Sequence, residues 1–321
     1  MFMERWGTAD PPASAWPRAR SYQSSKETRH MSDLASRIAA APISWGVWEA
    51  NGASGWTVPA AQYLQSVKDL GLKATEFGPE GYLPDDGDER KAMLDSYGLE
   101  GLGCFVPIML FKEDYDPLPE VEHILDVYEK AGASTIICAA ISGGKGYDDR
   151  PVLDEKGWDT LFTNLDRICA AARKHHIVPT LHHHMGTMIQ TADEIDKLLE
   201  RSDIGLCLDT GHATIAGIKP LDLARKHADR VTFVHLKDVH NEVAAKVQSG
   251  ELSYMDSLSQ GIFCPLGEGD AQIAEMIDTL EKAGYTGWYV MEQDAILSSG
   301  DDLPAAVADV KKSLDFLHTL H

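Results

Sequence analysis

Residues 178–212 read VPTLHHHMGTMIQTADEIDKLLERSDIGLCLDTGH and contain one complete strand–helix–strand unit. An apolar run ends in polar residues at His182, and a second apolar run ends in the same way at Asp209. Between the two runs, Thr191 precedes Glu194 by three residues, which is the pattern of a capping box at the start of a helix. Strands that alternate with helices form parallel sheets through right-handed crossovers. The stretch therefore predicts a βαβ unit.

The same alternation extends in both directions and occurs eight times from residue 38 onward. We predict strands over 38–45, 74–77, 101–107, 135–141, 178–184, 205–209, 231–236 and 288–292. The predicted helices cover 58–70, 88–97, 118–131, 155–175, 191–201, 220–228, 271–283 and 303–318. The turn after the first strand reads WGVWE and lacks the glycine fingerprint of an open dinucleotide-binding sheet. Eight such units predict an α/β fold of the closed (β/α)8 type, a TIM barrel.

The N-terminal segment differs in composition from the rest of the chain. Residues 1–32 are rich in proline, serine and arginine without hydrophobic periodicity, and we expect a flexible, disordered leader there. Residues 33–321 are expected to form a single barrel domain. The sequence has neither an apolar signal-peptide core nor a run of about 18 apolar residues, and its five cysteines include no C-x-x-C pair. We therefore predict a reduced, cytoplasmic protein.

The charge balance restricts the partners. Asp and Glu number 50 against 29 Lys and Arg, which gives a formal net charge of -21. A field of this sign repels phosphate backbones and anionic lipids, so roles at nucleic acids and membrane surfaces are not expected. Cations and neutral polyols experience no such repulsion. The charge is therefore compatible with a cation or a neutral polyol as the partner.

Four consecutive predicted strands end in imidazole and carboxyl side chains. The strand ends read LHHHMG at 181–186, DTGH at 209–212, HLKD at 235–238 and MEQD at 291–294. Each motif alone also fits a structural role, such as a helix cap or a surface ion pair. Because TIM barrels place their active sites at the C-terminal ends of the strands, all four together favour one open, mixed nitrogen and oxygen site for a divalent metal. Alternation along the strand puts His182 and His184 on one face and His183 on the other.

Aromatic residues and a long connection are further candidates for substrate contact. Trp45 and Trp48 follow the first predicted strand, and their faces suit the C–H faces of polyols, although core packing is an equal alternative. The connection 237–272 far exceeds usual loop lengths and predicts a lid or an interface.

From about residue 38 to its end, the chain resembles the sugar phosphate isomerase/epimerase superfamily of xylose isomerase-like barrels. The resemblance rests on DTGH, on HLKD, on PLGEG at 265–269 and on VME at 290–292. The segments APISWG at 41–46, TEFGP at 75–79 and HHHMGT at 182–187 narrow it to the inosose dehydratases, which remove water from a keto-inositol. The resemblance implies a metal site formed by His182, Asp209, His235 and Glu292. It also implies a homo-oligomer, either a dimer or a tetramer.

The chain departs from the superfamily at His182, where glutamate is usual. In the epimerases and isomerases, that glutamate and the one on the eighth strand exchange protons on neighbouring carbons. A histidine removes this symmetric pair and favours elimination, which needs a base for one proton and an acid for the departing hydroxyl. The histidine at this position leaves two possibilities open: His182 coordinates the metal, or His184 or water completes the site.

Together with these residues, the resemblance implies a metal-dependent hydro-lyase that acts on a keto-cyclitol in inositol catabolism by α-proton abstraction and β-elimination. The expected partner is then a small neutral polyol or keto-sugar. Manganese is the expected ion, with cobalt, zinc, iron and magnesium as alternatives. The candidates for proton transfer are Glu76, His184, His212 and Lys237, and a metal nearby would lower the pKa of Lys237. Asp238 is a candidate substrate contact. The alternatives are β-elimination from a 3-keto sugar or 3-keto-glycoside, and keto-sugar isomerisation or epimerisation.

Overall fold

The computed structural model describes residues 34–48, 55–144 and 146–320. The leader predicted for residues 1–32 lies outside these ranges. Within them, no helix combines the length and the apolar character that crossing a membrane requires.

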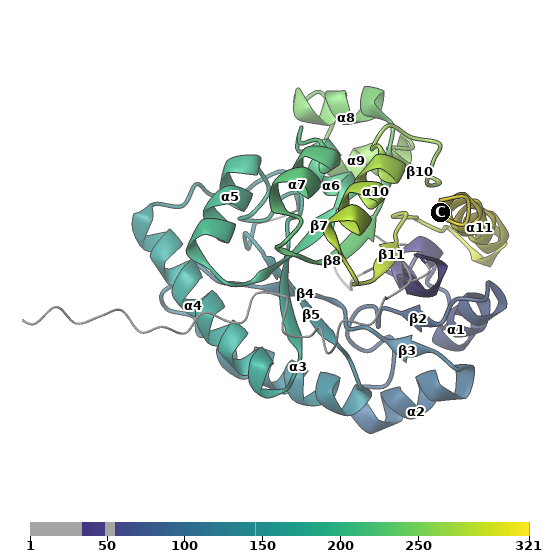
Figure 1. Cartoon of the computed structure of the whole chain (residues 1–321), viewed down its shortest axis with the longest axis horizontal. Helices are drawn as coiled ribbons and strands as arrows, with labels where there is room; N and C mark the ends of the chain where they lie inside the picture. Colours follow the sequence, from purple (N-terminus) through teal and green to yellow (C-terminus); the bar gives the residue numbers. More distant parts are fainter. Residues whose placement is uncertain (1–33, 49–54, 145, 321) are drawn as a thin grey trace, which may run out of the picture. The chain divides into compact units, whose positions relative to one another are not determined.

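Parallel strands form a closed barrel with helices around it (Figure 1), which confirms the predicted fold class. The strands of the barrel are β1 (Ile38–Ala40), β2 (Ala74–Thr75), β3 (Glu100–Gly101), β4 (Phe105–Ile108), β5 (Thr135–Ala140), β6 (Val178–His182), β7 (Gly205–Asp209), β8 (Val231–Leu236) and β11 (Tyr289–Met291). They are ordered β3-β2-β1-β11-β8-β7-β6-β5-β4, and each pair is parallel. The first and last strands of the barrel are therefore neighbours.

The third strand closes the barrel in two short pieces. β3 pairs with β2, whereas β4 pairs with β5, so the predicted strand 101–107 is wrong as one continuous element. Hydrogen bonds continue across the gap: Phe77 N donates to Gly103 O at 2.9 Å, and Thr135 N donates to Leu102 O at 3.1 Å. Gly103 lies in the gap at φ +116°, where side chains are rarely found. The segment 100–108 thus pairs with β2 at one edge of the sheet and with β5 at the other.

We expect Gly103→Ala to destabilise the protein by about 3 kcal/mol or more, because the strained φ adds to a steric clash. A Cβ atom at Gly103 would overlap the carbonyl oxygen of Thr135. Gly71→Ala is the matched control, since Gly71 also has a positive φ, +82°, but a Cβ there meets nothing within 4 Å among the described residues. The control should cost only about 1–2 kcal/mol. Urea unfolding measures the stability of both variants. Equal losses of stability would contradict the claim that the close contact at Gly103 closes the barrel.

The eight predicted helices are all present, with ends that differ by up to two residues from the prediction. They are α1 (Ala60–Asp69), α2 (Gly87–Tyr97), α3 (Leu118–Ala131), α4 (Glu155–Lys174), α5 (Ala192–Arg201), α7 (Pro220–His227), α10 (Ile273–Ala283) and α11 (Leu303–Leu317). The predicted capping box forms, since Thr191 Oγ1 accepts from Glu194 N and the Glu194 carboxylate accepts from Thr191 N. The first strand, predicted to reach Trp45, ends at Ala40, because Pro42 lacks an N–H and begins a 3-10 helix, Pro42–Trp45.

The connection after β8 is a structured excursion rather than an irregular loop. It contains β9 (Asp238–Val239), α8 (Asn241–Gln248), α9 (Tyr254–Ser259) and β10 (Phe263–Cys264), and β9 pairs with β10 in antiparallel fashion. α8 and α9 lie beside α6 (Thr210–Ile215), the short helix that follows β7 (Figure 1). Buried side chains from all three helices pack together with Met185 in a separate apolar cluster.

A buried apolar layer inside the barrel supports the polar strand ends. It includes Ala74, Cys207, Phe233 and Val290, one residue from each of four strands. Side chains two positions apart on a strand face the same side, so the next inward residues lie directly above this layer. Those residues are Glu76, Asp209, His235 and Glu292. The alternation of the strands thus brings the predicted polar residues to one end of the barrel.

Candidate active site

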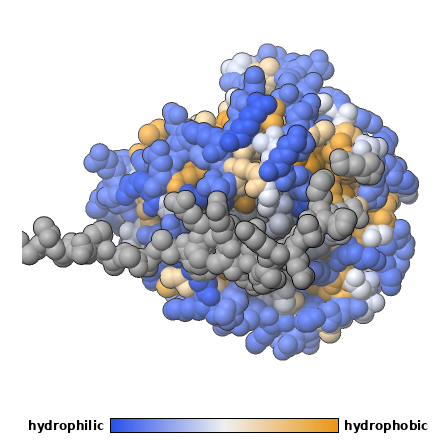
Figure 2. All heavy atoms as spheres, viewed as in Figure 1, coloured by the Kyte–Doolittle hydropathy of each residue, from blue (hydrophilic) through white to orange (hydrophobic). Residues whose placement is uncertain are grey.

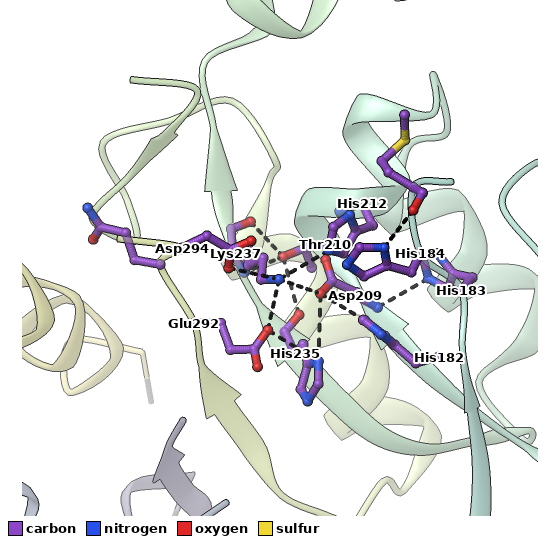
Figure 3. Close-up of polar contacts among 12 residues, drawn as sticks. His182, His183, His184, Asp209, Thr210, His212, His235, Lys237, Glu292 and Asp294 are labelled. Atoms are coloured by element: carbon purple, nitrogen blue, oxygen red, sulfur yellow. Dashed lines mark hydrogen bonds and ion pairs between the residues drawn. The ribbon is translucent and has the colours of Figure 1, made fainter. Parts of the chain in front are cut away.

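Four buried side chains predicted as metal ligands meet at the C-terminal ends of β6, β7, β8 and β11 (Figure 3). His182 Nε2 lies 3.1 Å from Asp209 Oδ2. His235 Nδ1 lies 3.7 Å from Asp209 Oδ2 and 3.3 Å from Glu292 Oε2. Ligand atoms at about 2.1 Å from a common ion would show similar mutual separations. The structure therefore brings the predicted set together.

Overlapping groups of side chains at this end of the barrel bring metal-binding atoms within 4.8 Å of one another. One group is His182, Asp209 and His212, and another is Glu76, His235 and Glu292. A third group places Cys207, from the apolar layer, with His182 and His235.

The orientation of His235 is suited to a metal ligand. Its Nε2 lies 2.7 Å from Glu76 Oε1 on one side of the ring. Its Nδ1 faces the oxygens of Asp209 and Glu292, yet it has no hydrogen-bond partner among the residues that the structure describes. A ligating imidazole commonly donates its second nitrogen to a carboxylate, which fixes the ring and directs the other nitrogen at the ion. The unpartnered nitrogen is thus explained if a cation lies between it and the two carboxylates.

Asp209 is held from two sides. Its Oδ1 accepts the His212 N–H at 2.7 Å as the N-cap of α6, and its own N–H donates to His183 Nε2 at 3.2 Å. Burial alone would raise the pKa of Asp209, but Lys237 and the neighbouring imidazoles hold it well below its ordinary value. Burial lowers the pKa of His183 to about 3. Asp209 is therefore a carboxylate at neutral pH, and His183, on the opposite face of β6, is a neutral structural contact.

The Lys237 ammonium lies among three carboxylates. Its Nζ is 2.9 Å from Glu292 Oε2, 3.0 Å from Asp294 Oδ1 and 3.5 Å from Asp209 Oδ2. Burial would lower the pKa of Lys237, but these carboxylates raise it well above its ordinary value. The lowered pKa that we predicted for Lys237 applies to the protein with a metal bound and stays a prediction. In this structure the carboxylates outweigh burial, so Lys237 is an ammonium at neutral pH.

The rings of His184 and His212 lie close together next to Lys237, with their planes inclined by 40°. Their ring centroids are 3.7 Å apart. His184 Nδ1 donates to the carbonyl oxygen of Met185 at 2.7 Å, so its Nε2 carries the lone pair. Lys237 Nζ donates to His212 Nε2 at 3.2 Å. Burial, together with the neighbouring positive charges, lowers the pKa of both imidazoles well below the ordinary value, and both are neutral at pH 7.

Glu76, predicted to transfer protons, contacts His235 instead. Burial raises the pKa of Glu76, although His235 partly offsets this effect. Its hydrogen bond to His235 favours a positioning role over the predicted catalytic one.

The predicted substrate contacts have different outcomes. Trp45 is fully buried, donates its indole N–H to Ser66 Oγ at 3.0 Å and packs edge-on against Tyr63. The prediction that Trp45 lines a substrate site is therefore wrong, because core packing covers both faces. Trp48 is partly exposed and donates to the carbonyl oxygen of Ala295 at 2.6 Å, so its role at a substrate stays a prediction.

Asp238, the other predicted substrate contact, is a structural residue. Its carboxylate accepts backbone N–H groups from Val239, Gly267, Gly269 and Ala271 at 2.8–3.0 Å. A Cβ atom at Gly269 would approach Asp238 Oδ1 to 2.5 Å, so only glycine permits this turn. The PLGEG motif thus forms a turn around a buried carboxylate, and the predicted substrate role is wrong.

We expect Asp238→Ala to destabilise the protein by about 3 kcal/mol, because it leaves several buried N–H groups without an acceptor. Asp238→Asn, which keeps one oxygen, should have an intermediate effect. Urea unfolding gives the stability, and KM for the substrate is measured in parallel. Unchanged stability together with a raised KM would contradict the structural role and would show that Asp238 contacts the substrate.

Two residues of the site received no individual role from the sequence analysis. Asp294 carries one of the three carboxylates around Lys237, and Tyr254 Oη donates to Asp294 Oδ2 at 3.1 Å. Asp294 could have been found, since it ends the MEQD motif two positions beyond Glu292. Tyr254 lies in the connection 237–272 that was predicted to form a lid or an interface, but its contact with Asp294 depends on how that connection folds.

Comparisons with known proteins agree with this architecture. The model of the xylose isomerase-like TIM barrel family matches residues 64–320. The rhizopine catabolism protein MocC of Rhizobium meliloti is 32% identical over 269 residues, which cover 80% of this chain and 81% of that protein. An inosose dehydratase of Geobacillus thermodenitrificans is 31% identical over 270 residues, which cover 80% of this chain and 89% of the dehydratase.

Solved structures share the fold at lower sequence identity. The crystal structure of the IOLI protein with a bound zinc atom superposes with a TM-score of 0.64 at 11% identity. The superposition covers 89% of this chain and 99% of that one.

Proposed function

The chain belongs to the xylose isomerase-like TIM barrel family, and from this premise we propose that it is a metal-dependent lyase that removes water from a keto-cyclitol. One observation supports elimination most directly: an ammonium and a neutral imidazole with a free lone pair lie beside the same ligand cluster. Lys237 supplies the ammonium and His184 the imidazole. Elimination needs an acid and a base of different kinds, whereas epimerisation exchanges protons between two similar groups. The identity with an inosose dehydratase supports the cyclitol substrate.

The proposed ligands for one divalent ion are His182, Asp209, His235 and Glu292. An ion held there would act as a Lewis acid toward the ketone oxygen of the substrate. Two imidazoles and two carboxylates suit manganese, iron, cobalt and zinc, of which manganese is the ion predicted from the sequence. Glu76 acts through His235, because its carboxyl fixes the imidazole by a hydrogen bond at Nε2.

The proton transfers are assigned to His184 and Lys237. His184 Nε2 takes the proton from the carbon next to the ketone, and the C–H electron pair becomes the new carbon–carbon double bond. The β-hydroxyl leaves with the electron pair of its C–O bond, accepts a proton from the Lys237 ammonium and departs as water. His212 accepts a hydrogen bond from Lys237, so we assign it to holding that ammonium.

A neutral substrate suits the electrostatics of the chain. Hydrophilic residues predominate on the face shown in Figure 2, and the net charge is -21. Such a field would slow the approach of a sugar phosphate but not of an uncharged keto-cyclitol. The cytoplasmic location and the assembly into dimers or tetramers stay predictions.

The proposal is tested by incubating manganese-loaded protein with scyllo-inosose, a 3-keto-glucoside and a free ketose. Mass spectrometry and ultraviolet absorbance follow the products. Loss of one water from the inosose, with a new conjugated chromophore, is the expected result. Release of an aglycone from the glucoside would move the activity to 3-keto-glycosides, and an isobaric product would replace the lyase with an isomerase or epimerase.

A further inference from the structure

We propose that Tyr254, on α9 of the excursion after β8, is a positioning residue that holds the Lys237 ammonium in place through Asp294. This inference rests on the proposed function for the reaction step that it concerns. The chain of contacts itself is independent of the substrate.

The two oxygens of one carboxylate connect the tyrosine to the lysine. Tyr254 Oη donates to Asp294 Oδ2 at 3.1 Å, and Asp294 Oδ1 lies 3.0 Å from Lys237 Nζ. Tyr254 is 1% exposed, and both charged side chains are buried as well. A buried carboxylate that is held at one oxygen by a fixed hydroxyl has little freedom to rotate. The position of its other oxygen, and of the ammonium paired with it, therefore depends on Tyr254.

Ligand chemistry makes Asp294 the decisive partner of Lys237. Of the three carboxylates around the ammonium, Asp209 and Glu292 belong to the proposed ligand set. A divalent ion bound by them would compete with the lysine for their oxygens. Asp294 lies outside the ligand groups, and Tyr254 occupies its second oxygen. In the metal-loaded protein, Asp294 would thus be the carboxylate that keeps Lys237 in place.

Tyr254 is itself fixed by two other parts of the rim. Its backbone N–H donates to Asp148 Oδ1 at 2.8 Å, in the connection between β5 and α4. Its ring centroid lies 5.5 Å from that of Tyr147 and 5.7 Å from that of His212. Ser253 caps α9 and accepts the Asp256 N–H at 3.0 Å, which holds the first turn of the helix. The excursion therefore presents this hydroxyl from a rigid support.

The expected effect concerns one step of the reaction. Tyr254→Phe removes the hydroxyl and keeps the ring, so Asp294 can rotate and Lys237 loses its defined position. Protonation of the departing hydroxyl should become slower, and kcat for dehydration should fall about 10–100-fold, as for other residues that act through a neighbour. Exchange of the α-proton with heavy water depends on His184 and should change less than about twofold, and KM should be similarly unaffected.

The control is Tyr289→Phe. Tyr289 also donates its hydroxyl to a carboxylate, Glu281 Oε1 at 2.8 Å, but at the start of β11 and away from the strand ends that form the site. This variant should leave both exchange and dehydration unchanged. Equal losses of exchange and dehydration in Tyr254→Phe would indicate a general structural defect and would overturn the proposal. Unchanged dehydration would overturn it as well.

A second measurement needs no substrate. Crystal structures of the manganese-loaded parent and of Tyr254→Phe should show Lys237 Nζ within hydrogen-bond distance of Asp294 in the parent and displaced from it in the variant. A parent in which Lys237 leaves Asp294 on metal binding would refute the positioning role. If the parent dehydrates none of the three ketones, the proposed function fails, while these structures still decide the role of Tyr254.

Discussion

Replacing Asp209 with alanine is expected to abolish divalent-metal binding together with dehydration. Asp209 Oδ2 faces His182, His235 and Lys237 at 3.1–3.7 Å, so the substitution removes the oxygen at the centre of the cluster. Loss of the Lewis acid should cost about 4 kcal/mol or more of transition-state stabilisation, which is at least about 10³-fold in turnover. Metal analysis after dialysis and kcat on the keto-cyclitol measure the two effects.

The structural contribution of Asp209 can be separated from its role as a ligand. Asp209→Asn retains an oxygen that can cap α6 at His212, so its stability should exceed that of the alanine variant by about 1 kcal/mol. The metal content of Asp209→Asn should nevertheless be as low as that of Asp209→Ala. Asp222→Ala, which breaks only an exposed ion pair with Arg225, is the control and should keep both metal and activity. Full activity of the parent after exhaustive chelation would contradict the metal-dependent mechanism.

The second large effect is expected for Lys237→Met. The substitution removes the proposed acid, and kcat for dehydration should fall about 10²–10⁴-fold. It also leaves Asp209, Glu292 and Asp294 facing one another without the ammonium, so the metal-free protein should unfold at a lower temperature. Added manganese should restore more stability to the variant than to the parent. Kinetic assays and thermal unfolding with and without the ion measure these effects.

Lys237→Arg distinguishes charge from proton transfer. A guanidinium retains the positive charge, so most of the stability should remain. It gives up protons far less readily than an ammonium, so dehydration should stay slow. An arginine variant as active as the parent would show that Lys237 acts only through its charge, and the acid would then have to be another residue.

The barrel was predictable because apolar strand patterns and amphipathic helix patterns alternate eight times along the chain. The meeting of polar side chains at one rim was predictable for the same reason, since parallel strands bring their C-terminal ends to the same end of the barrel. The choice of four of them as metal ligands came from the family resemblance and stays a proposal. His182, Asp209, His235 and Glu292 all lie at such ends. No local sequence pattern distinguishes one divalent metal from another, so metal analysis of the purified protein must identify the ion.

The two wrong substrate contacts share one physical cause, which is that partners distant in sequence decide the role of a polar or aromatic side chain. Asp238 directly follows Lys237 in the HLKD motif, but its carboxylate is used by a turn about thirty residues later. Trp45 follows the first strand in the sequence, where rim residues are expected, but its side chain contacts Ser66 and Tyr63 on α1. Neither contact has a periodic signature, so local patterns could not distinguish a substrate contact from a structural one.

The proposed metal ligands come only from residues 182–292, whereas the first half of the barrel contributes supporting and bordering side chains such as Glu76 and Phe105. The Phe105 ring lies 5.6 Å from the rings of both His182 and His184, although it belongs to β4. A smaller side chain at Phe105 would open the wall beside these two imidazoles without removing a proposed ligand. Glu76 differs in this respect, because its carboxyl fixes the ring of His235. Under the proposed function, directed evolution toward a different keto-cyclitol would therefore begin with a library at Phe105.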